Sequence, residues 1–447
     1  MYDKNRSLRS CDGSIDFLRE YSDILKEECF TARHTSGLKI LVSPKKRSSV
    51  SAVIATKYGA VDIDISRASD ASPVITPHGV AHFLEHQLFA TPDGHDAQDD
   101  FSMLGSEVNA YTTYDKTAYT FACTESYERS LELLLKMVSE PSFKKSSVDK
   151  ERGIITEEIR MNADSPWERC YSEALRAMYS SHPVREDICG TERSIADITP
   201  EILYKCHKRF YAPPNMALAV SGDVDPCAVI AICDRVLDDK RFDGVTDVSP
   251  KRSFDEPYRV AREYTSVEVH APKTAFCIGI KNSADGIAAG KEMLLRELTM
   301  SVLFEMLFSR TAPLYNSLFE KGMISPDFSY GSAIGEGFSF VTVSGEADEP
   351  DAVYDAFLKH LGRLRKDGLS RDDFLRNRRI MYADFVTGFD STDDIANTLM
   401  NYALDGISPF EFINTVSNLR FEDVCELFEK IADDKNFVLS VARASGQ

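Results

Sequence analysis

Hydrophobic and polar residues alternate with a period of two near the start of the chain. From Phe30 to about Ile65, the stretches LKILVS and SSVSAVIATKYGAV are separated by turn residues, Ser36-Gly37 and the basic PKKR. Alternation of this kind is typical of strands that bury one face. The pattern therefore predicts strands of an antiparallel sheet, and EVNAYTTYDKTAYTFA, residues 107 to 122, predicts a hairpin.

Other segments place apolar residues every three or four positions, which predicts helices. They are SYERSLELLLKMVSE, SSVDKERGIITEEIRMNAD and the stretch after Pro166. Thr76 followed by Pro77 predicts the start of another helix, because threonine is a frequent N-cap and proline a frequent first helical residue. That helix would contain HGVAHFLEHQLF, residues 78 to 89, and end before TPDG. NMALAVSGDV, from Asn215, predicts a strand and a turn.

The chain divides into two similar parts. Between about Lys240 and Glu263 the apolar residues have no regular spacing, which predicts a linker at residues 241–263. A shift of about 220 residues aligns NFVLSV near the C-terminus with NMALAV, and VLFEMLF, which begins at Val302, with HFLEHQL. We interpret this as a duplication. It predicts an α+β protein with two homologous α/β-sandwich halves, residues 1–240 and 264–447.

Composition narrows the possible partners and the location. A formal net charge of −19 disfavours nucleic acid as a partner. No apolar run approaches the roughly 20 residues of a membrane span, and the first residues lack the apolar core of a secretory signal. Ten cysteines without a Cys-x-x-Cys pair favour reduced thiols. We therefore expect a cytoplasmic protein. The acidic balance indicates either solubility alone or a preference for basic substrates.

The segment HGVAHFLEHQLF carries the strongest chemical pattern in the chain. On a helix, His82 and His86 lie about 40° apart on one face, and Glu85 lies beside them. Two imidazoles can bind zinc, and a neighbouring carboxylate can take a proton from water at the metal. Val302 and Met306 occupy the equivalent places in the second half, so only the first half could hold the metal. The alternative is a buried helix whose histidines have ordinary hydrogen bonds.

A third ligand is expected from the segment DKERGIITEEIRMN. Glu151 and Glu158 are seven residues apart and share one helix face, whereas Glu157 points elsewhere. Ile154 and Ile155 lie on the same side as the two acids, which predicts that this side is buried. A buried carboxylate needs a partner, and a metal ion is one. The alternative is that the acids are solvated.

The chain resembles the insulinase/pitrilysin family of zinc metallopeptidases with an inverted motif, in particular the short bacterial members similar to mitochondrial processing peptidase. The resemblance covers nearly the whole chain. It rests on five landmarks in family order: GVAHFLEHQLF, GSEVNAYTTYDKTAYTF, ERGIITEEIRM, HPVREDICGTERSI and FYAPPNMALAVSGDV.

The resemblance implies a role for each motif residue. His82, His86 and Glu158 would bind Zn²⁺, Glu85 would be the general base, and Glu151 would support the site from outside the ligand set. Asn109 and the Ala110 backbone would pair an extended peptide substrate by strand addition. The alternative for Asn109 is a simple turn residue. The family also implies that the two halves enclose a chamber, and it implies endopeptidase activity on peptides or unfolded segments.

One departure from the family affects the prediction. Active members have a C-terminal arginine and tyrosine, seven residues apart, that polarise the scissile carbonyl. Here Phe319 and Pro326 stand at those places. In two-chain relatives one subunit carries the zinc motif and the other the Arg/Tyr pair, so the resemblance implies a heterodimer whose partner closes the chamber. A homodimer of low activity, or a peptide-binding or assembly subunit with little turnover, are the alternatives.

Overall fold

The computed structural model describes residues 7–11, 15–66, 72–237, 252, 254–283, 287, 289–432 and 434–445. Two compact units make up the chain, and each combines segments that are distant in sequence. The first unit comprises Met1–Thr156, Ile188–Lys251 and Asp384–Glu411. The second unit comprises Glu157–Asp187, Arg252–Ala383 and Phe412–Gln447.

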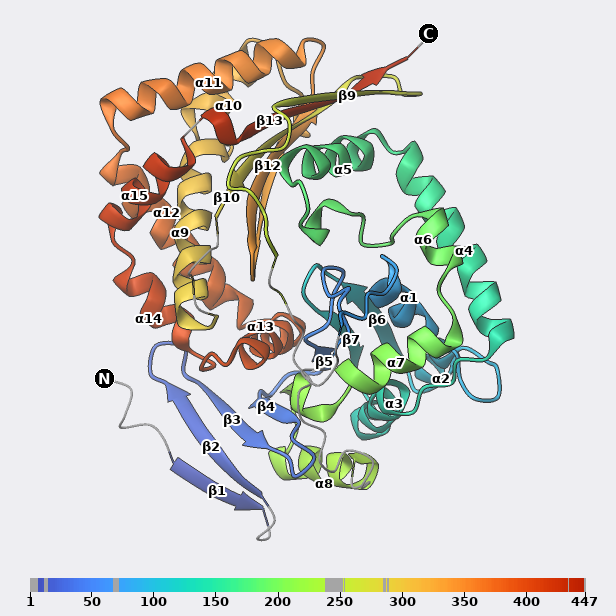
Figure 1. Ribbon diagram of the computed structural model, residues 1–447. Helices are drawn as coiled ribbons and strands as arrows, with labels where there is room; N and C mark the ends of the chain where they lie inside the picture. The colour runs from blue at the N-terminus through green and yellow to red at the C-terminus, as the bar shows by residue number, and fades with distance from the viewer. Residues whose placement is uncertain are drawn as a thin grey trace. The chain divides into compact units, whose positions relative to one another are not determined.

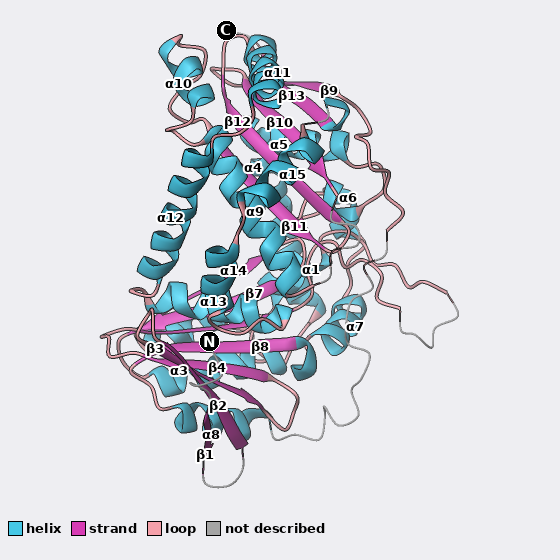
Figure 2. Cartoon of the chain, turned by 90° about the vertical axis from the view of Figure 1, so that its left-hand side faces the viewer, coloured by secondary structure: helices cyan, strands magenta, loops and turns pink. Residues whose placement is uncertain are grey.

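The first unit is built on a sheet of eight described strands in the order β1-β2-β3-β4-β8-β5-β7-β6. Figure 2 labels β2, β3, β4 and β8 of this sheet. Only β4 and β8 run parallel, and all other neighbours are antiparallel. The predicted antiparallel sheet and hairpin are therefore confirmed. The bounds are β1 (Ser7–Cys11), β2 (Ile15–Ser22), β3 (Glu27–Arg33), β4 (Lys39–Pro44), β5 (Val50–Thr56), β6 (Ser106–Thr112), β7 (Thr117–Cys123) and β8 (Met216–Gly222).

Helix α13 (Thr392–Asp405) belongs to the first unit although it comes from the C-terminal part of the chain (Figure 1). It lies against β8, β5 and β4. Leu399 and Met400 are fully buried there, in one cluster with Val53 and Ala217 of the sheet. The other helices with residues in this unit are α1 (Val80–Gln87), α2 (Ala97–Met103), α3 (Tyr127–Ser139), α4 (Lys145–Asp164), α6 (Glu192–Ala196), α7 (Pro200–Phe210) and α8 (Pro226–Leu237).

The second unit repeats this strand order in a smaller sheet. Its strands follow β11-β12-β10-β13-β9, which matches β6-β7-β5-β8-β4 position by position. The parallel pair also recurs, because β13 runs parallel to β9 as β8 does to β4. This agreement supports the predicted duplication. The bounds are β9 (Tyr264–Val269), β10 (Ala275–Asn282), β11 (Ser329–Gly335), β12 (Phe338–Glu346) and β13 (Phe437–Ala444).

Helix α5 (Pro166–Met178) packs on β10, β13 and β9 of the second unit, although it comes from the N-terminal part of the chain (Figure 1). The compact units therefore differ from the contiguous halves 1–240 and 264–447. Of the expected linker 241–263, residues 241–251 and 253 lie outside the described residues. The other helices with residues in this unit are α9 (Lys291–Phe308), α10 (Pro313–Glu320), α11 (Pro350–Asp367), α12 (Arg371–Gly388), α14 (Glu411–Asn418) and α15 (Phe421–Ile431).

The predicted start of the motif helix is wrong. Helix α1 begins at Val80, and its N-cap is Gly79, whose φ is +91°. Thr76 does not cap it, because both the Thr76 backbone and its hydroxyl donate to the Ile63 carbonyl. Ile75, next to Thr76, forms an isolated antiparallel bridge with Asp64, and His78 and Gly79 form a turn before α1 begins.

The cysteines agree with the expectation in part. Cys227 is disulfide-bonded, which the sequence did not predict. Eight others are free thiols: Cys29, Cys123, Cys170, Cys189, Cys206, Cys233, Cys277 and Cys425. Among the described residues, no helix is both long enough and apolar enough to cross a membrane.

Candidate metal centre

Helices α1 and α4 bring two imidazoles and one carboxylate together. One ligand atom from each of His82, His86 and Glu158 lies within 4.8 Å of the others. Glu158 follows Glu151 by two turns of the continuous helix α4, so the helix itself fixes its place. This is the one such cluster of histidine, cysteine or acidic side chains found in the described part of the chain.

The donor set fits zinc. Catalytic zinc sites commonly use three protein ligands from histidine and carboxylate, and they keep one position for water or substrate. Two nitrogens and one oxygen at this spacing match that requirement. The same donors also suit other divalent transition metals.

His86 and Glu151 form a supporting contact. The Nδ1 atom of His86 lies 2.9 Å from Oε1 of Glu151. A carboxylate in contact with one imidazole nitrogen fixes the tautomer and the orientation of the ring. Nε2 is therefore the nitrogen through which His86 would bind a metal. The family resemblance implied that Glu151 supports the site from outside the ligand set, and the structure places its carboxylate against His86.

His82 is held in its neutral form. Burial, with a smaller contribution from the neighbouring His86, lowers the pKa of His82 to about 3. The ring is 7% exposed, and its Nε2 lies 3.9 Å from the Cys189 thiol. A neutral imidazole is the form that binds metal ions, so His82 needs no deprotonation at neutral pH.

Glu85 lies on α1 between the two histidines and is 9% exposed. Its Oε2 accepts a hydrogen bond from the Thr112 hydroxyl over 2.6 Å. Thr112 is the last residue of β6, and sequence reasoning missed it. The sequence did contain a signal for Thr112. This residue lies in NAYTT, three residues after Asn109, and side chains alternate along a strand, so Thr112 is expected on the opposite face from Asn109.

The covered side of α4 is narrower than expected. Ile155 is fully buried, and Glu151 and Glu158 are half-buried on the same side. Ile154 is instead 47% exposed, so the prediction of its burial is wrong. It lies about 60° from Glu151 around the helix, away from Ile155, which is enough to reach solvent. Glu157 is exposed, as expected, and it pairs with Arg160.

Two glycines bring the start of α1 against a distant loop. A Cβ on Gly79 would lie 2.6 Å from the Cys189 carbonyl oxygen. A Cβ on Gly190 would lie 2.7 Å from the His78 carbonyl oxygen. Both glycines have positive φ, which other residues rarely adopt. The close approach therefore requires glycine on both sides, and it holds α1 next to Cys189.

The strand β6 is an edge of its sheet, as the resemblance implied. Asn109 is exposed on it, and its Oδ1 accepts a hydrogen bond from the Ala110 backbone N–H over 2.8 Å. An edge strand has backbone groups that no neighbour in the sheet uses, so an extended peptide can pair with it.

The second unit has an apolar helix where the first has the metal cluster. Val302 and Met306 of α9 are buried in its core. Phe319 on α10 is 46% exposed and stacks on Tyr315. The Pro326 carbonyl accepts a hydrogen bond from Arg310. Neither Phe319 nor Pro326 has a side chain that can donate to a carbonyl oxygen.

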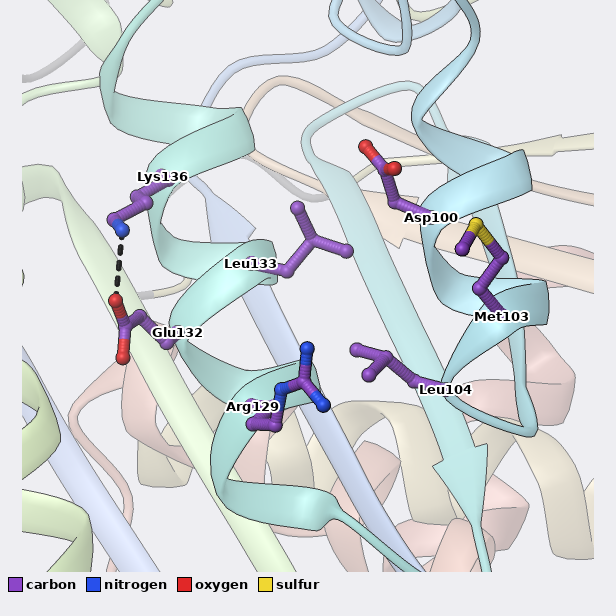
Figure 3. Close-up of a pocket in the computed structure, with 7 residues that line it drawn as sticks. All are labelled: Asp100, Met103, Leu104, Arg129, Glu132, Leu133 and Lys136. Carbon is purple, nitrogen blue, oxygen red and sulfur yellow. Dashed lines mark hydrogen bonds and ion pairs between the residues drawn. The ribbon is translucent and has the colours of Figure 1, made fainter.

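A separate cavity of about 440 Å³ lies between α2 and α3 of the first unit (Figure 3). Leu104 and Leu133 face each other in it, and the ion pair Glu132–Lys136 lies at its side. It contains no residue of the metal cluster. Its lining is Asp100, Met103, Leu104, Arg129, Glu132, Leu133 and Lys136.

Comparison with known proteins agrees with this geometry. Residues 75–192 match the family model "Insulinase (Peptidase family M16)", and residues 197–381 match "Peptidase M16 inactive domain". A protein of Bacillus subtilis (strain 168), named as the uncharacterized zinc protease YmfH, is 35% identical over 94% of this chain and 98% of its own length. This chain belongs to the insulinase family, peptidase family M16. The predicted family is confirmed.

Solved structures of M16 proteins share the fold. The crystal structure of an M16-like peptidase from Alicyclobacillus acidocaldarius has a TM-score of 0.87 and 30% identity, over 93% of this chain and 98% of that one. Pitrilysin matches with a TM-score of 0.72 over 98% of this chain and 46% of its own, at 16% identity, which shows the fold alone. The predicted two α/β units are confirmed.

Proposed function

We propose that this M16 chain is a zinc-dependent endopeptidase subunit that hydrolyses internal bonds of peptides or unfolded segments. The observation that carries the proposal is the convergence of His82, His86 and Glu158 beside Glu85. The names of relatives add support, since YmfH and YmxG of Bacillus subtilis (strain 168) are both named as zinc proteases.

His82, His86 and Glu158 would hold the metal, and Glu151 would orient His86. Bound zinc would lower the pKa of water and polarise the scissile carbonyl. Glu85 would act as general base: its carboxylate accepts a proton from the attacking water and passes it to the leaving amine. The Thr112 hydroxyl, which donates to Oε2, would hold the carboxylate in place. Strand β6, with Asn109 and Ala110, would hold the peptide extended.

We further propose that a second M16 subunit completes the site. Phe319 and Pro326 cannot supply the carbonyl contacts that the family expects from arginine and tyrosine. A partner that carries this pair would close the chamber, and a homodimer of low activity is the alternative. A cytoplasmic location stays a prediction.

The second candidate is a peptide-binding or assembly subunit with little turnover. Phe319 and Pro326 favour this candidate, because losing the two side chains that donate to the transition state costs on the order of a hundredfold or more in rate. The full set of zinc ligands, His82, His86 and Glu158, favours the enzyme.

The test combines metal content with cleavage of a quenched peptide library by wild type and Glu85→Gln, each alone and with lysate of the source organism. We expect one zinc per chain and cleavage that is stronger with lysate and absent in Glu85→Gln. Bound zinc with no cleavage under either condition would favour the binding subunit. Full activity of the purified chain alone would contradict the need for a partner.

A further inference from the structure

The hydroxyl of Thr112 has one strong partner. Its Oγ1 donates to Oε2 of Glu85 over 2.6 Å, which is in the range of a short charge-assisted hydrogen bond. The next nearest hydroxyl, that of Thr117, lies 3.4 Å away. Thr117 already donates to the Tyr58 carbonyl over 2.9 Å, so its proton is committed elsewhere. Thr117 therefore does not donate to Thr112, and the Glu85 carboxylate is both the nearer and the charged acceptor, so the single proton of Thr112 goes to Glu85.

The surroundings make this bond selective for one orientation of the carboxylate. Glu85 is 9% exposed and Thr117 is fully buried, so bulk water has little access to Oε2. A hydrogen bond from a fixed donor in such a place restricts rotation of the carboxylate more than solvent does. Thr112 itself is fixed by its pairing with Thr117 across the hairpin β6–β7.

We propose that Thr112 is a positioning residue that aims the Glu85 carboxylate and ties it to the strand on which the peptide would lie. Thr112 and Ala110 are two residues apart on β6, so one strand carries both the peptide-pairing backbone and the donor to the general base. The geometry of substrate and base would then be set by one rigid element. This inference rests on the proposed endopeptidase function.

The chain offers matched variants for a test. Thr112→Val keeps the shape and removes the hydroxyl, whereas Thr112→Ser keeps the hydroxyl and removes a methyl group. Thr120→Val is the control, because Thr120 lies on the neighbouring strand β7 and its hydroxyl has no hydrogen-bond partner within the described residues. All four proteins, wild type included, are loaded with one equivalent of zinc.

For peptide cleavage we expect Thr112→Val to lower kcat about tenfold to a hundredfold with KM within twofold, because a misaimed base affects the chemical step. Thr112→Ser should recover most of the loss, and Thr120→Val should match wild type. Zinc stoichiometry should be equal in all. Unchanged kcat in Thr112→Val, or an equal loss in Thr112→Ser, would overturn the positioning role.

A second measurement needs no turnover. Urea unfolding of Thr112→Val, Glu85→Leu and the double variant tests whether the two side chains are coupled. We expect Thr112→Val to lower the urea midpoint when Glu85 is present and to leave it unchanged in the Glu85→Leu background. Equal effects in both backgrounds would overturn the contact itself. If wild type binds zinc but cleaves nothing, either alone or with lysate of the source organism, the proposed function fails, while this cycle still tests the hydrogen bond between Thr112 and Glu85.

Discussion

At the scale of single residues, the site depends on side chains whose protonation and orientation are fixed by close neighbours. The motif spacing was readable from sequence because His82, Glu85 and His86 share one helix, where covalent geometry sets their relation. Thr112 was not readable, because its contact with Glu85 depends on where a hairpin 27 residues away lies in space. A contact between two separate elements can be identified only when the fold is known.

Glu151 gives a prediction about metal affinity. Replacing it by glutamine removes the carboxylate that lies 2.9 Å from His86 Nδ1. We expect Glu151→Gln to weaken zinc binding about tenfold to a hundredfold, as is typical for residues that orient a ligand. Competition with a chelating dye measures this. Glu157→Gln, on the exposed side of the same helix, should bind zinc as wild type does; equal weakening in both variants would show a general effect of charge.

His207 gives a prediction about pH. It is buried, and Nε2 contacts the Val138 carbonyl. Burial lowers its pKa to about 4, from about 6.5 in the unfolded chain. Above pH 6.5 the ring is neutral in both states, so His207 costs no stability there. As the pH falls toward 4, the unfolded chain binds a proton that the folded protein does not, and the free energy of unfolding decreases by up to about 3 kcal/mol.

Urea unfolding between pH 7.5 and pH 4.5 tests this expectation. The His207→Gln variant keeps a donor for Val138 but does not titrate. Its free energy of unfolding should depend less steeply on pH than that of wild type. Over part of this range the difference in slope should correspond to the uptake of about one proton on unfolding. Parallel curves for the two proteins would mean that His207 does not lose stability through protonation.

At the scale of elements, the decisive features are where a helix begins and which side it covers. Elements with long and regular apolar periods could be predicted: α3, α4 and the hairpin β6–β7 lie where the pattern placed them. The start of α1 could not, because Thr76 and Pro77 fit a helix cap locally, whereas Thr76 bonds the Ile63 carbonyl and the chain turns at His78 and Gly79 before the helix begins. Local signals cannot report the carbonyl of Ile63 that Thr76 bonds.

Gly79 gives a prediction about the start of α1. Gly79→Ala would force a Cβ to within 2.6 Å of the Cys189 carbonyl oxygen, so the helix start or the loop must shift. Gly94→Ala is the matched control: its φ is +98° and no atom lies within 4 Å of its added Cβ. We expect Gly79→Ala to lose about 1 to 3 kcal/mol more stability than the control, and to bind zinc more weakly. Thermal unfolding and zinc titration measure both; similar losses would show that backbone strain alone is responsible.

At the scale of the whole molecule, sequence predicted two similar parts but not how helices are distributed between them. A helical period shows that α13 buries one face, yet it cannot say which sheet receives that face. The repeated strand order confirms that both parts have the same plan. The exchange of α5 and α13 between sequence halves became visible only in the fold.

This exchange gives a prediction about fragments. A fragment of residues 1–240 lacks α13, so the sheet face at β5 and β8 would lose the cover of Leu399 and Met400. We expect this fragment alone to aggregate or to unfold without cooperativity. Expressed together with residues 252–447, it should copurify as a folded complex. Size-exclusion chromatography and circular dichroism provide the readout, and a cooperative, monomeric fragment 1–240 would contradict the expectation.

The exchange also constrains how such a chain could arise. In this chain α5 and α13 each cover the sheet formed by the other sequence half, so an ancestor with a single copy would have had a helix that does not cover its own sheet. It could have buried that helix only on a second molecule, as a domain-swapped homodimer with two identical metal sites. Fusion of the two genes would have made the swap intramolecular. From then on one copy could carry Val302 and Met306 at the places of His82 and His86 without losing the partner that completes its fold.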